Sequence, residues 1–407
     1  MRPINSFART FVRGVRRRAT QKPASFIEDA TTFADTHTVL SDPFTPMPYP
    51  EKQLFGYLKQ TQDEKHEKVA QKALKKEAYL KNGLNFDHIP IEKQIFLLFP
   101  GQGEQHVGMG KQLKDSPLSM ELFERASEYL KYDLWDLCRA GPKSKLDLTL
   151  HANTAVFVTG VAAVEKMRAN IEDFDERLTN AAGFGVGEFC SLVAGGILSF
   201  DDALRIVDAQ ARLIHECNQL VSCQTFAVQV KASSQLDQAI SEAKEMAIEK
   251  GEMPLCETSA YVYCGLKMMG ASRLCKKFLE ENSERFQFKI VKNFPIIGAP
   301  YTGLMRPAQS DMDNVLKGID KFGKPHINVY SNYLGKVYPN KKQQVRMCMF
   351  RQFSSPLKWE QIMQILYRFH QNYKFPTICE VGSSKQLSSC VFQTSKKAHQ
   401  KYNNFPC

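Results

Sequence analysis

Long apolar runs are absent from this 407-residue sequence, which has no stretch of 18 or more apolar residues without a charge. A transmembrane helix needs about 20 such residues, so we expect no membrane span. The sequence also lacks a C-x-x-C pair and any His/Cys group at metal-ligand spacing, although it contains eleven cysteines. Disulfide frameworks belong mainly to short secreted chains. We therefore expect reduced, mostly buried thiols, and neither a metal nor another cofactor.

Acidic residues are missing from the start of the chain, where none precedes Glu28. Phe7, Phe11 and Val15 recur at helical spacing in this segment. It holds a large part of the net charge of +11, on Arg2, Arg9, Arg13, Arg16, Arg17, Arg18 and Lys22. The pattern is typical of a mitochondrial transit peptide, which predicts a targeting segment at residues 1–25 and a location in the mitochondrial matrix. The alternative is a basic arm for nucleic acid or an anionic membrane. No aromatic and basic patch follows to support it, so we expect no nucleic-acid partner.

The composition, 43% hydrophobic and 24% charged, suffices to bury a full core. Residues 26–93 are rich in proline at first and then charged and helix-favouring, which predicts a linker and a charged helical extension. The continuous apolar run Ile95–Phe99 is what a strand buried on both faces of a parallel sheet needs. Helical and strand-like patterns alternate after it, and this alternation predicts an α/β domain made of residues 94–223 and 296–405.

An insert in this domain is predicted at residues 224–295, where the pattern changes. Its expected order is close to βαββαβ, with one strand not separately recognised, and this order favours a ferredoxin-like subdomain. The expected elements are a strand at 226–230, a helix at 234–250, a strand at 260–266, a helix at 271–281 and a strand at 286–291.

Two glycine-rich segments stand out, Phe99–Gln105 and Gly183–Glu188. Neither has the glycine spacing or the Lys-Ser/Thr of a nucleotide-binding loop. The second fits a strand-turn-helix elbow, in which small residues allow a sharp turn that lifts the central residue above the sheet. A hydroxyl at the centre attacks, and the next backbone amide binds the oxyanion. Here the central residue is Gly185, so the elbow is predicted without its nucleophile.

Further motifs follow one another along the chain at Gln102 and Gln105, Gly183–Glu188, Asp201–Glu216, Gly298–Pro307 and Glu380–Gly382. Their order and separations resemble the malonyl-CoA:acyl-carrier-protein transacylase family, of the mitochondrial type. The resemblance extends from about Gln94 to the C-terminus and implies an α/β-hydrolase-like acyltransferase domain, with a mostly parallel sheet and an inserted ferredoxin-like subdomain.

The resemblance implies roles that the residues present do not fit. The family's nucleophilic serine falls on Gly185, its catalytic histidine on Tyr301, and the arginine that holds the malonyl carboxylate on Gln210. A phenol with a pKa of about 10 is a poor base near neutrality, and glutamine lacks both the charge and the forked geometry of arginine. Gln102 and the backbone amide of Val186 match the oxyanion-hole positions and are retained.

These substitutions predict a non-catalytic relative of the S-malonyltransferase that acts as a mitochondrial binding or scaffold protein. The expected partner is acyl carrier protein or a mitochondrial protein assembly, and the substituted site gives no reason to prefer a malonyl thioester of coenzyme A. The alternative is an active S-malonyltransferase of mitochondrial fatty-acid synthesis that uses a displaced nucleophile. Cys190 is five residues beyond Gly185, about 7.5 Å along the following helix, and so is not at the tip of the elbow.

Overall fold

The computed structural model describes residues 83–368, 374–382 and 385–407. The predicted targeting segment, and the predicted linker and helical extension up to residue 82, lie outside these residues. The described residues belong to one compact unit. Within it, residues before the expected boundary at 94 already pack on the sheet, because the backbone N–H of Leu84 donates to Asn328 Oδ1 (2.7 Å) and the Gln94 side chain donates to the carbonyl of Ile89 (2.9 Å).

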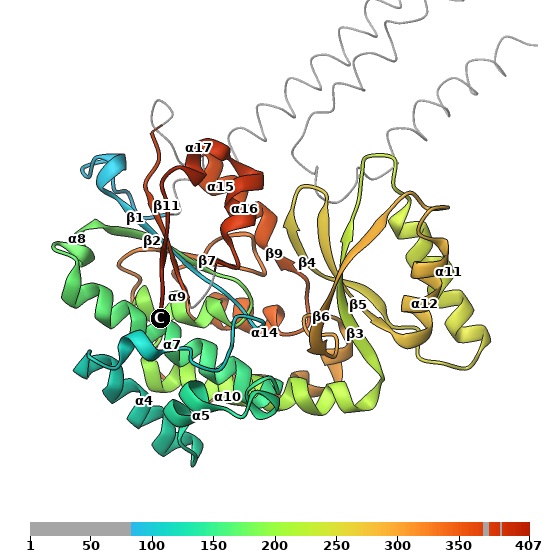
Figure 1. The fold of residues 1–407 in the computed structure, drawn as a ribbon, viewed down its shortest axis with the longest axis horizontal. Coiled ribbons are helices and arrows are strands. Elements are labelled where there is room, and N and C mark those ends of the chain that lie inside the picture. Colours follow the sequence, from blue (N-terminus) through green and yellow to red (C-terminus); the bar gives the residue numbers. More distant parts are fainter. Residues whose placement is uncertain (1–82, 369–373, 383–384) are drawn as a thin grey trace, which may run out of the picture. The chain divides into compact units, whose positions relative to one another are not determined.

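A six-stranded sheet forms the centre of the larger part of this unit (Figure 1). The order is β11-β10-β1-β2-β7-β8, and all neighbours are parallel except the last pair. β1 lies in the interior of the sheet and is buried at all five positions, which confirms the prediction for this apolar run. The strands are β1 (Ile95–Phe99), β2 (Leu178–Gly183), β7 (Asn328–Ser331), β8 (Lys336–Val337), β10 (Thr377–Val381) and β11 (Tyr402–Phe405).

Helices cover this sheet and complete the α/β architecture that the sequence predicted. The longest, α7, is buried over most of its length and packs against α4, α9 and α10. Before β2 come α4 (Pro117–Leu130), α5 (Leu134–Ala140), α6 (Lys143–Leu146), α7 (Thr149–Asn170) and α8 (Phe174–Arg177). After it come α9 (Gly187–Ala194), α10 (Phe200–Leu220), α13 (Gln309–Lys317), α14 (Lys342–Gln352), α15 (Trp359–Arg368), α16 (Ser388–Thr394) and α17 (Lys396–His399). Short 3-10 helices are η1 (Ile91–Lys93), η2 (Lys111–Leu113) and η3 (Gly303–Ala308).

The insert forms a second, mainly antiparallel sheet of order β6-β3-β5-β4-β9, in which the last pair is parallel. Its chain order is the βαββαβ order of a ferredoxin-like fold. The single strand expected at 260–266 is two strands joined by a tight turn at Cys264 and Gly265. The elements are β3 (Cys223–Gln229), α11 (Leu236–Glu249), β4 (Cys256–Tyr263), β5 (Leu266–Ser272), α12 (Arg273–Asn282) and β6 (Lys289–Ile297), with β9 (Leu357–Lys358) added from the main domain.

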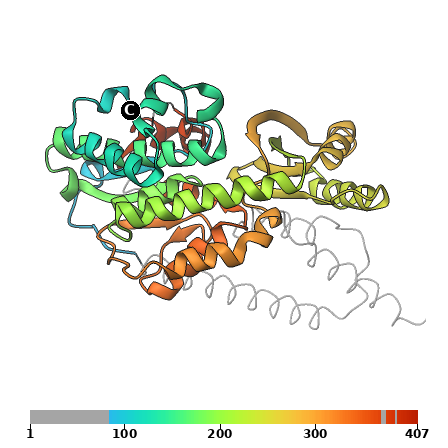
Figure 2. The ribbon, with the colours of Figure 1, turned by 90° about the horizontal axis from the view of Figure 1, so that it is seen from below.

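Two connections join the insert to the main domain. α10 runs directly into β3, and the view of Figure 2 shows this long helix, in yellow-green, extending from one part to the other. The return passes through Gly298 after β6, where Asn218 Oδ1 on α10 accepts from the N–H of Ala299 (3.1 Å). A Cβ atom at position 298 would lie 2.0 Å from the Asn218 side chain, so only glycine fits this crossing.

Within the described residues, no helix has the length and apolarity that a bilayer span requires. All eleven cysteines are free thiols, and all but Cys264 are buried, in agreement with the expected reduced and mostly buried state.

Candidate active site

The elbow connects β2 to α9 through Phe184, Gly185 and Val186. Gly185 has a φ of +58°, a left-handed conformation that glycine adopts with little steric cost. Gly183 faces the start of α9 so closely that a Cβ atom there would lie 1.9 Å from the Gly187 backbone. The strand-turn-helix geometry expected from the glycine spacing is therefore present, and small residues are what permit it.

Tyr301 lies directly over the centre of the elbow. A Cβ atom at position 185 would lie 2.7 Å from Tyr301 Oη, and its three nearest atoms would all belong to this phenol. Tyr301 itself has a φ of +61°, which is uncommon for a residue other than glycine. The structure thus brings together the two positions that the resemblance assigns to nucleophile and base, and the phenol fills the space of the missing side chain.

Aromatic packing holds this arrangement from the other side. The rings of Phe184 and Trp359 meet edge to face, with centroids 5.6 Å apart. Phe184 and Tyr301 both pack against the buried cluster that contains Trp359 and Leu357. Phe184, which follows β2, and Tyr301, which follows β6, therefore contribute to one hydrophobic surface beside the elbow.

Gln210 is connected to the elbow by hydrogen bonds between neutral amides. It lies on α10, is fully buried, and donates from Nε2 to Gln352 Oε1 (2.9 Å). Gln352 in turn donates from Nε2 to the Gly185 carbonyl (3.1 Å). The Gln210 Oε1 atom has no hydrogen-bond partner in the described part of the chain. The position that the resemblance assigns to the carboxylate-binding arginine is thus close to the elbow. Its glutamine offers a carboxylate no positive charge.

Asn332 and Glu188 stabilise the turn through a network of hydrogen bonds. Asn332 accepts from the Gly185 N–H at Oδ1 (3.1 Å) and donates from Nδ2 to the Gly183 carbonyl (2.6 Å). The Asn332 backbone N–H and the Tyr338 hydroxyl both donate to Glu188 Oε1.

Burial raises the pKa of Glu188 to about 8. Burial, and then the nearby Glu188 carboxyl, raise the pKa of Tyr301 well above its ordinary value. Near neutral pH this side chain is therefore protonated even more completely than a free tyrosine and has no phenolate to accept a proton.

The two positions that the resemblance assigns to the oxyanion hole differ in their surroundings. Gln102 donates from Nε2 to Thr149 Oγ1 (3.1 Å) at the start of α7. Val186 is fully buried at the start of α9.

The sequence analysis did not identify Asn332 and Gln352 as elbow residues. They are 147 and 167 positions from Gly185, and no local motif marks them.

Other hydroxyl and thiol groups near the elbow are engaged in local hydrogen bonds. Cys190 is buried and donates to the Phe157 carbonyl (3.5 Å), and burial raises its pKa far above the ordinary range of a thiol. Ser191 donates to the Glu188 carbonyl (2.7 Å), and Thr302 donates to the Ala299 carbonyl (2.6 Å). None of these three groups is placed at the tip of the elbow, and none is activated by a neighbouring base in the contacts of the described residues.

The fold and the strand-turn-helix elbow are those of the acyltransferase class of folds. Residues 96–242 match the family model of the acyl transferase domain. The chain is 36% identical over 316 residues to the mitochondrial malonyl-CoA-acyl carrier protein transacylase of Mus musculus, covering 77% of this chain and 82% of the mouse protein. The Homo sapiens protein of the same name is 35% identical over 308 residues, covering 75% of this chain and 78% of that protein. The chain belongs to the malonyl-CoA-acyl carrier protein transacylase family.

Solved structures of lower identity share the fold. The malonyl CoA-acyl carrier protein transacylase of Coxiella burnetii superposes with a TM-score of 0.67 at 21% identity, over 78% of this chain and 95% of that protein. A malonyl-transacylase solved in complex with its type II polyketide synthase acyl-carrier protein gives a TM-score of 0.64 at 21% identity, over 76% of this chain and 94% of that protein. The expected fold class, an acyltransferase domain with an inserted subdomain, is confirmed.

Proposed function

We propose that this chain is a non-catalytic member of its family that acts in mitochondria as a binding or scaffold protein. The observation that carries the proposal is the phenol of Tyr301, which lies where a side chain at position 185 would project. A serine and a histidine act as one unit in acyl transfer, and in a well-studied hydrolase the loss of either costs about 10⁶-fold in rate. Here both positions are substituted, and the substitutions fit each other.

Gln210, which lies at the position of the family's carboxylate-binding arginine, supports the same proposal independently. Selective binding of a carboxylate uses a charged, two-pronged donor. Gln210 instead uses its donor group in the bond to Gln352. The other polar atom of its amide, Oε1, is a buried acceptor without a hydrogen-bond partner in the described residues, and it would repel a malonyl carboxylate.

A mitochondrial location is supported by two observations. The mouse and human relatives are mitochondrial proteins by name, and the first residues of this chain are rich in arginine and free of acids. We propose that residues 1–25 direct the chain to the matrix. A fusion of these residues to a fluorescent reporter is expected to enter mitochondria, and a fusion in which the arginines are replaced by glutamine is expected to stay outside.

The partner that we propose is acyl carrier protein or an assembly of mitochondrial proteins. A structural neighbour, a malonyl-transacylase, was solved in complex with its acyl-carrier protein, and this complex supports acyl carrier protein as the partner. Binding of purified holo acyl carrier protein to the full chain, measured by calorimetry, tests this part of the proposal directly.

Malonyl transfer is the experiment that separates the proposal from the enzymatic alternative. The purified chain is incubated with labelled malonyl-CoA and holo acyl carrier protein, and both proteins are then examined by mass spectrometry. We expect no malonyl group on either. Transfer by the natural chain that persists in Gly185→Ala would overturn the proposal and establish a displaced nucleophile.

A restored variant tests whether the substituted groups are what silences the site. It combines Gly185→Ser, Tyr301→His and Gln210→Arg, so that the tyrosine that crowds position 185 is replaced together with the glycine. The matched control carries Gly185→Ala with the same two other changes and therefore lacks only the hydroxyl. We expect transfer from the serine variant alone; equal transfer from the alanine control would show that another residue is acylated.

A further inference from the structure

The segment that carries Tyr301 connects the insert to the main domain, and the insert binds its backbone on both sides of the tyrosine. Before Tyr301, the Thr225 hydroxyl on β3 donates to the carbonyl of Gly298 (2.7 Å). After it, Glu257 Oε2 on β4 accepts from the N–H of Gly303 (2.7 Å). The phenol between these two anchors lies over the elbow of the main domain. One short segment therefore joins the insert to the elbow.

A third contact with this segment comes from β5 of the insert. Gly270 faces the segment so closely that a Cβ atom there would lie 2.6 Å from the Ala299 Cβ and 3.2 Å from Thr302 Cγ2. Thr302 also donates to the Ala299 carbonyl (2.6 Å), which closes the turn that contains Tyr301. Three adjacent strands of the insert, β3, β5 and β4, thus contact the segment on both sides of the tyrosine.

Tyr301 depends on such contacts because its backbone has a φ of +61°. The left-handed conformation is unfavourable for a residue with a Cβ atom, and it persists only where the surrounding structure holds it. Among the anchors, Glu257 provides a charged acceptor, and a hydrogen bond to a charged group is stronger than one between neutral groups. Its other oxygen lies 3.9 Å from the Lys244 ammonium group on α11, so a helix of the insert also holds this carboxylate.

We infer that the insert controls the closure of the elbow through Glu257. This carboxylate is a positioning residue: by accepting from the Gly303 N–H, it keeps Tyr301 in the left-handed conformation and the phenol over Gly185. Loss of the bond lets the backbone of Tyr301 relax to a right-handed conformation, which withdraws the phenol from the elbow. The inference rests on the proposed function in one respect, that the phenol closes the elbow, and it names the contact that governs this closure.

A double-mutant cycle on the full chain, measured by urea denaturation, tests the inference. Gly185→Ala brings a Cβ atom against the Tyr301 hydroxyl, so its cost in stability reports whether the phenol is in place. In the Glu257→Ala background we expect this cost to fall to about half or less, because the released tyrosine moves aside. A merely structural role of Glu257 gives additive losses, and additivity would overturn the inference.

Glu257→Gln is the conservative variant in this cycle. Glutamine keeps an oxygen that accepts from the Gly303 N–H, so we expect it to leave the cost of Gly185→Ala as it is in the natural chain. A cost as low as in Glu257→Ala would refute the role of this hydrogen bond.

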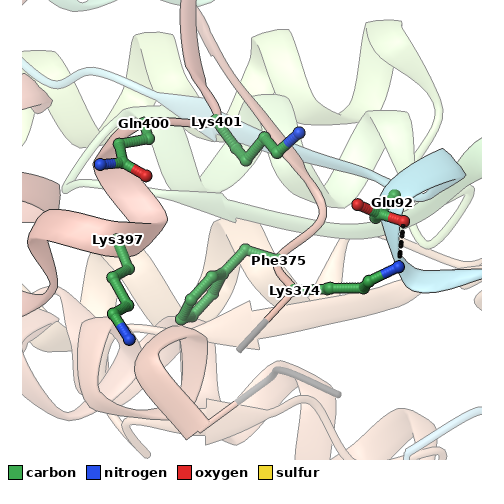
Figure 3. Close-up of a pocket in the computed structure, with 6 residues that line it drawn as sticks. All are labelled: Glu92, Lys374, Phe375, Lys397, Gln400 and Lys401. Atoms are coloured by element: carbon green, nitrogen blue, oxygen red, sulfur yellow. Dashed lines mark hydrogen bonds and ion pairs between the residues drawn. The ribbon is translucent and has the colours of Figure 1, made fainter. Parts of the chain in front are cut away.

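Glu92→Ala is the matched control, because Glu92 also pairs with a lysine, Lys374 (3.0 Å). Figure 3 shows this pair in a hollow lined by residues that precede β1 and β10. The elbow follows the carboxyl end of β2, which is parallel to β1, so the pair lies toward the opposite edge of the sheet. We expect Glu92→Ala to leave the cost of Gly185→Ala unchanged. A reduced cost would show that the loss of any surface ion pair relaxes the elbow, and would refute a specific anchor.

Hydrogen–deuterium exchange provides a second measurement, made on chains that keep Gly185. Withdrawal of Tyr301 removes packing from the cluster that it shares with Phe184. We expect the amides of residues 184–188 to exchange about fivefold faster in Glu257→Ala than in the natural chain, since the loss of a hydrogen bond favours local opening by a factor of this order. Equal exchange would contradict the withdrawal of the phenol. Neither measurement involves malonyl transfer, so a failure of this inference is distinguishable from a failure of the proposed function.

Discussion

At the scale of single residues, Gly185 and Tyr301 are adapted to each other. A side chain at position 185 would have to adopt a left-handed φ of +58° and would also meet the Tyr301 hydroxyl at 2.7 Å. Interatomic distances below about 3 Å to a Cβ carbon are not tolerated in close-packed interiors. The phenol therefore stabilises the present elbow and at the same time excludes the residue that acyl transfer requires.

Replacement of Gly185 by alanine measures this fit. We expect the free energy of unfolding to fall by about 1 kcal/mol for the left-handed conformation and by a further ~1–3 kcal/mol for the contact with Tyr301. The double variant Gly185→Ala with Tyr301→Phe should recover part of the second loss, because the nearest remaining atom lies at 3.3 Å. Urea denaturation at neutral pH provides the measurement.

Gly251 provides the control for this comparison. It has a φ of +68°, and a Cβ atom there would meet nothing within 4 Å. Gly251→Ala should therefore show the conformational loss alone. Equal losses for Gly251→Ala and Gly185→Ala would contradict a close contact between Gly185 and Tyr301.

At the scale of elements, the first turn of α9 carries an acidic side chain into a buried environment. Glu188 is 1% exposed and accepts hydrogen bonds from the Asn332 backbone and the Tyr338 hydroxyl, while its Oε2 atom has no partner in the described residues. Burial and hydrogen bonds, and no neighbouring cation of the described residues, determine the pKa of Glu188. Loss of the proton would bury an uncompensated charge, and for this reason its pKa is raised.

The stability of the chain should consequently depend on pH through Glu188. The folded chain holds this proton up to about pH 8, while the ordinary pKa is 4.5. The folded state thus binds more protons between these two values, so its stability falls as the pH rises from about 4.5 to 8, by at most about 1.4 kcal/mol per pH unit.

Glu188→Gln keeps the acceptor and removes the titration. We expect the variant to gain stability relative to the natural chain as the pH is raised from 5 to 8, as judged by urea denaturation at a series of about four pH values. Glu380, whose pKa is raised to about 7 mainly by burial, contributes equally to both proteins and cancels in the difference. Parallel pH profiles would contradict a buried, protonated Glu188.

At the scale of the whole molecule, the solvent exposure of the eleven thiols shows how completely the two sheets and their helices bury the described residues. Cys264, in the turn between β4 and β5, is exposed, and the other ten lie in the interior. Burial also raises the pKa of most of the buried thiols, for example that of Cys348 to about 12. Both effects suppress reaction with a disulfide reagent.

Titration of the native chain with such a reagent is therefore expected to label Cys264 alone, and the remaining thiols only after unfolding. Cys264→Ser should abolish the native signal without changing the total gained on denaturation beyond the loss of one group. Rapid labelling of several thiols in the native chain would show that the interior opens far more readily than this packing allows.

The sequence by itself determined the elements whose signals are local. The apolar run of β1 and the glycine spacing of the elbow were both predictable, because a buried strand and a sharp turn leave their pattern within about 5 consecutive residues. The loss of the nucleophile at Gly185 was visible for the same reason. The turn at Cys264 and Gly265 was missed, since two apolar strands with a short connection read as one.

Only the tertiary structure decided what surrounds the elbow. Asn332 and Gln352 bind the backbone of Gly185 across 147 and 167 positions of the chain, and no periodicity encodes a contact between such distant segments. The same holds for the phenol at position 301, whose place over Gly185 depends on the path of the chain through the insert and back at Gly298. The sequence showed that a nucleophile was missing; the folding of distant segments onto one edge of the sheet decided that an aromatic side chain fills its place.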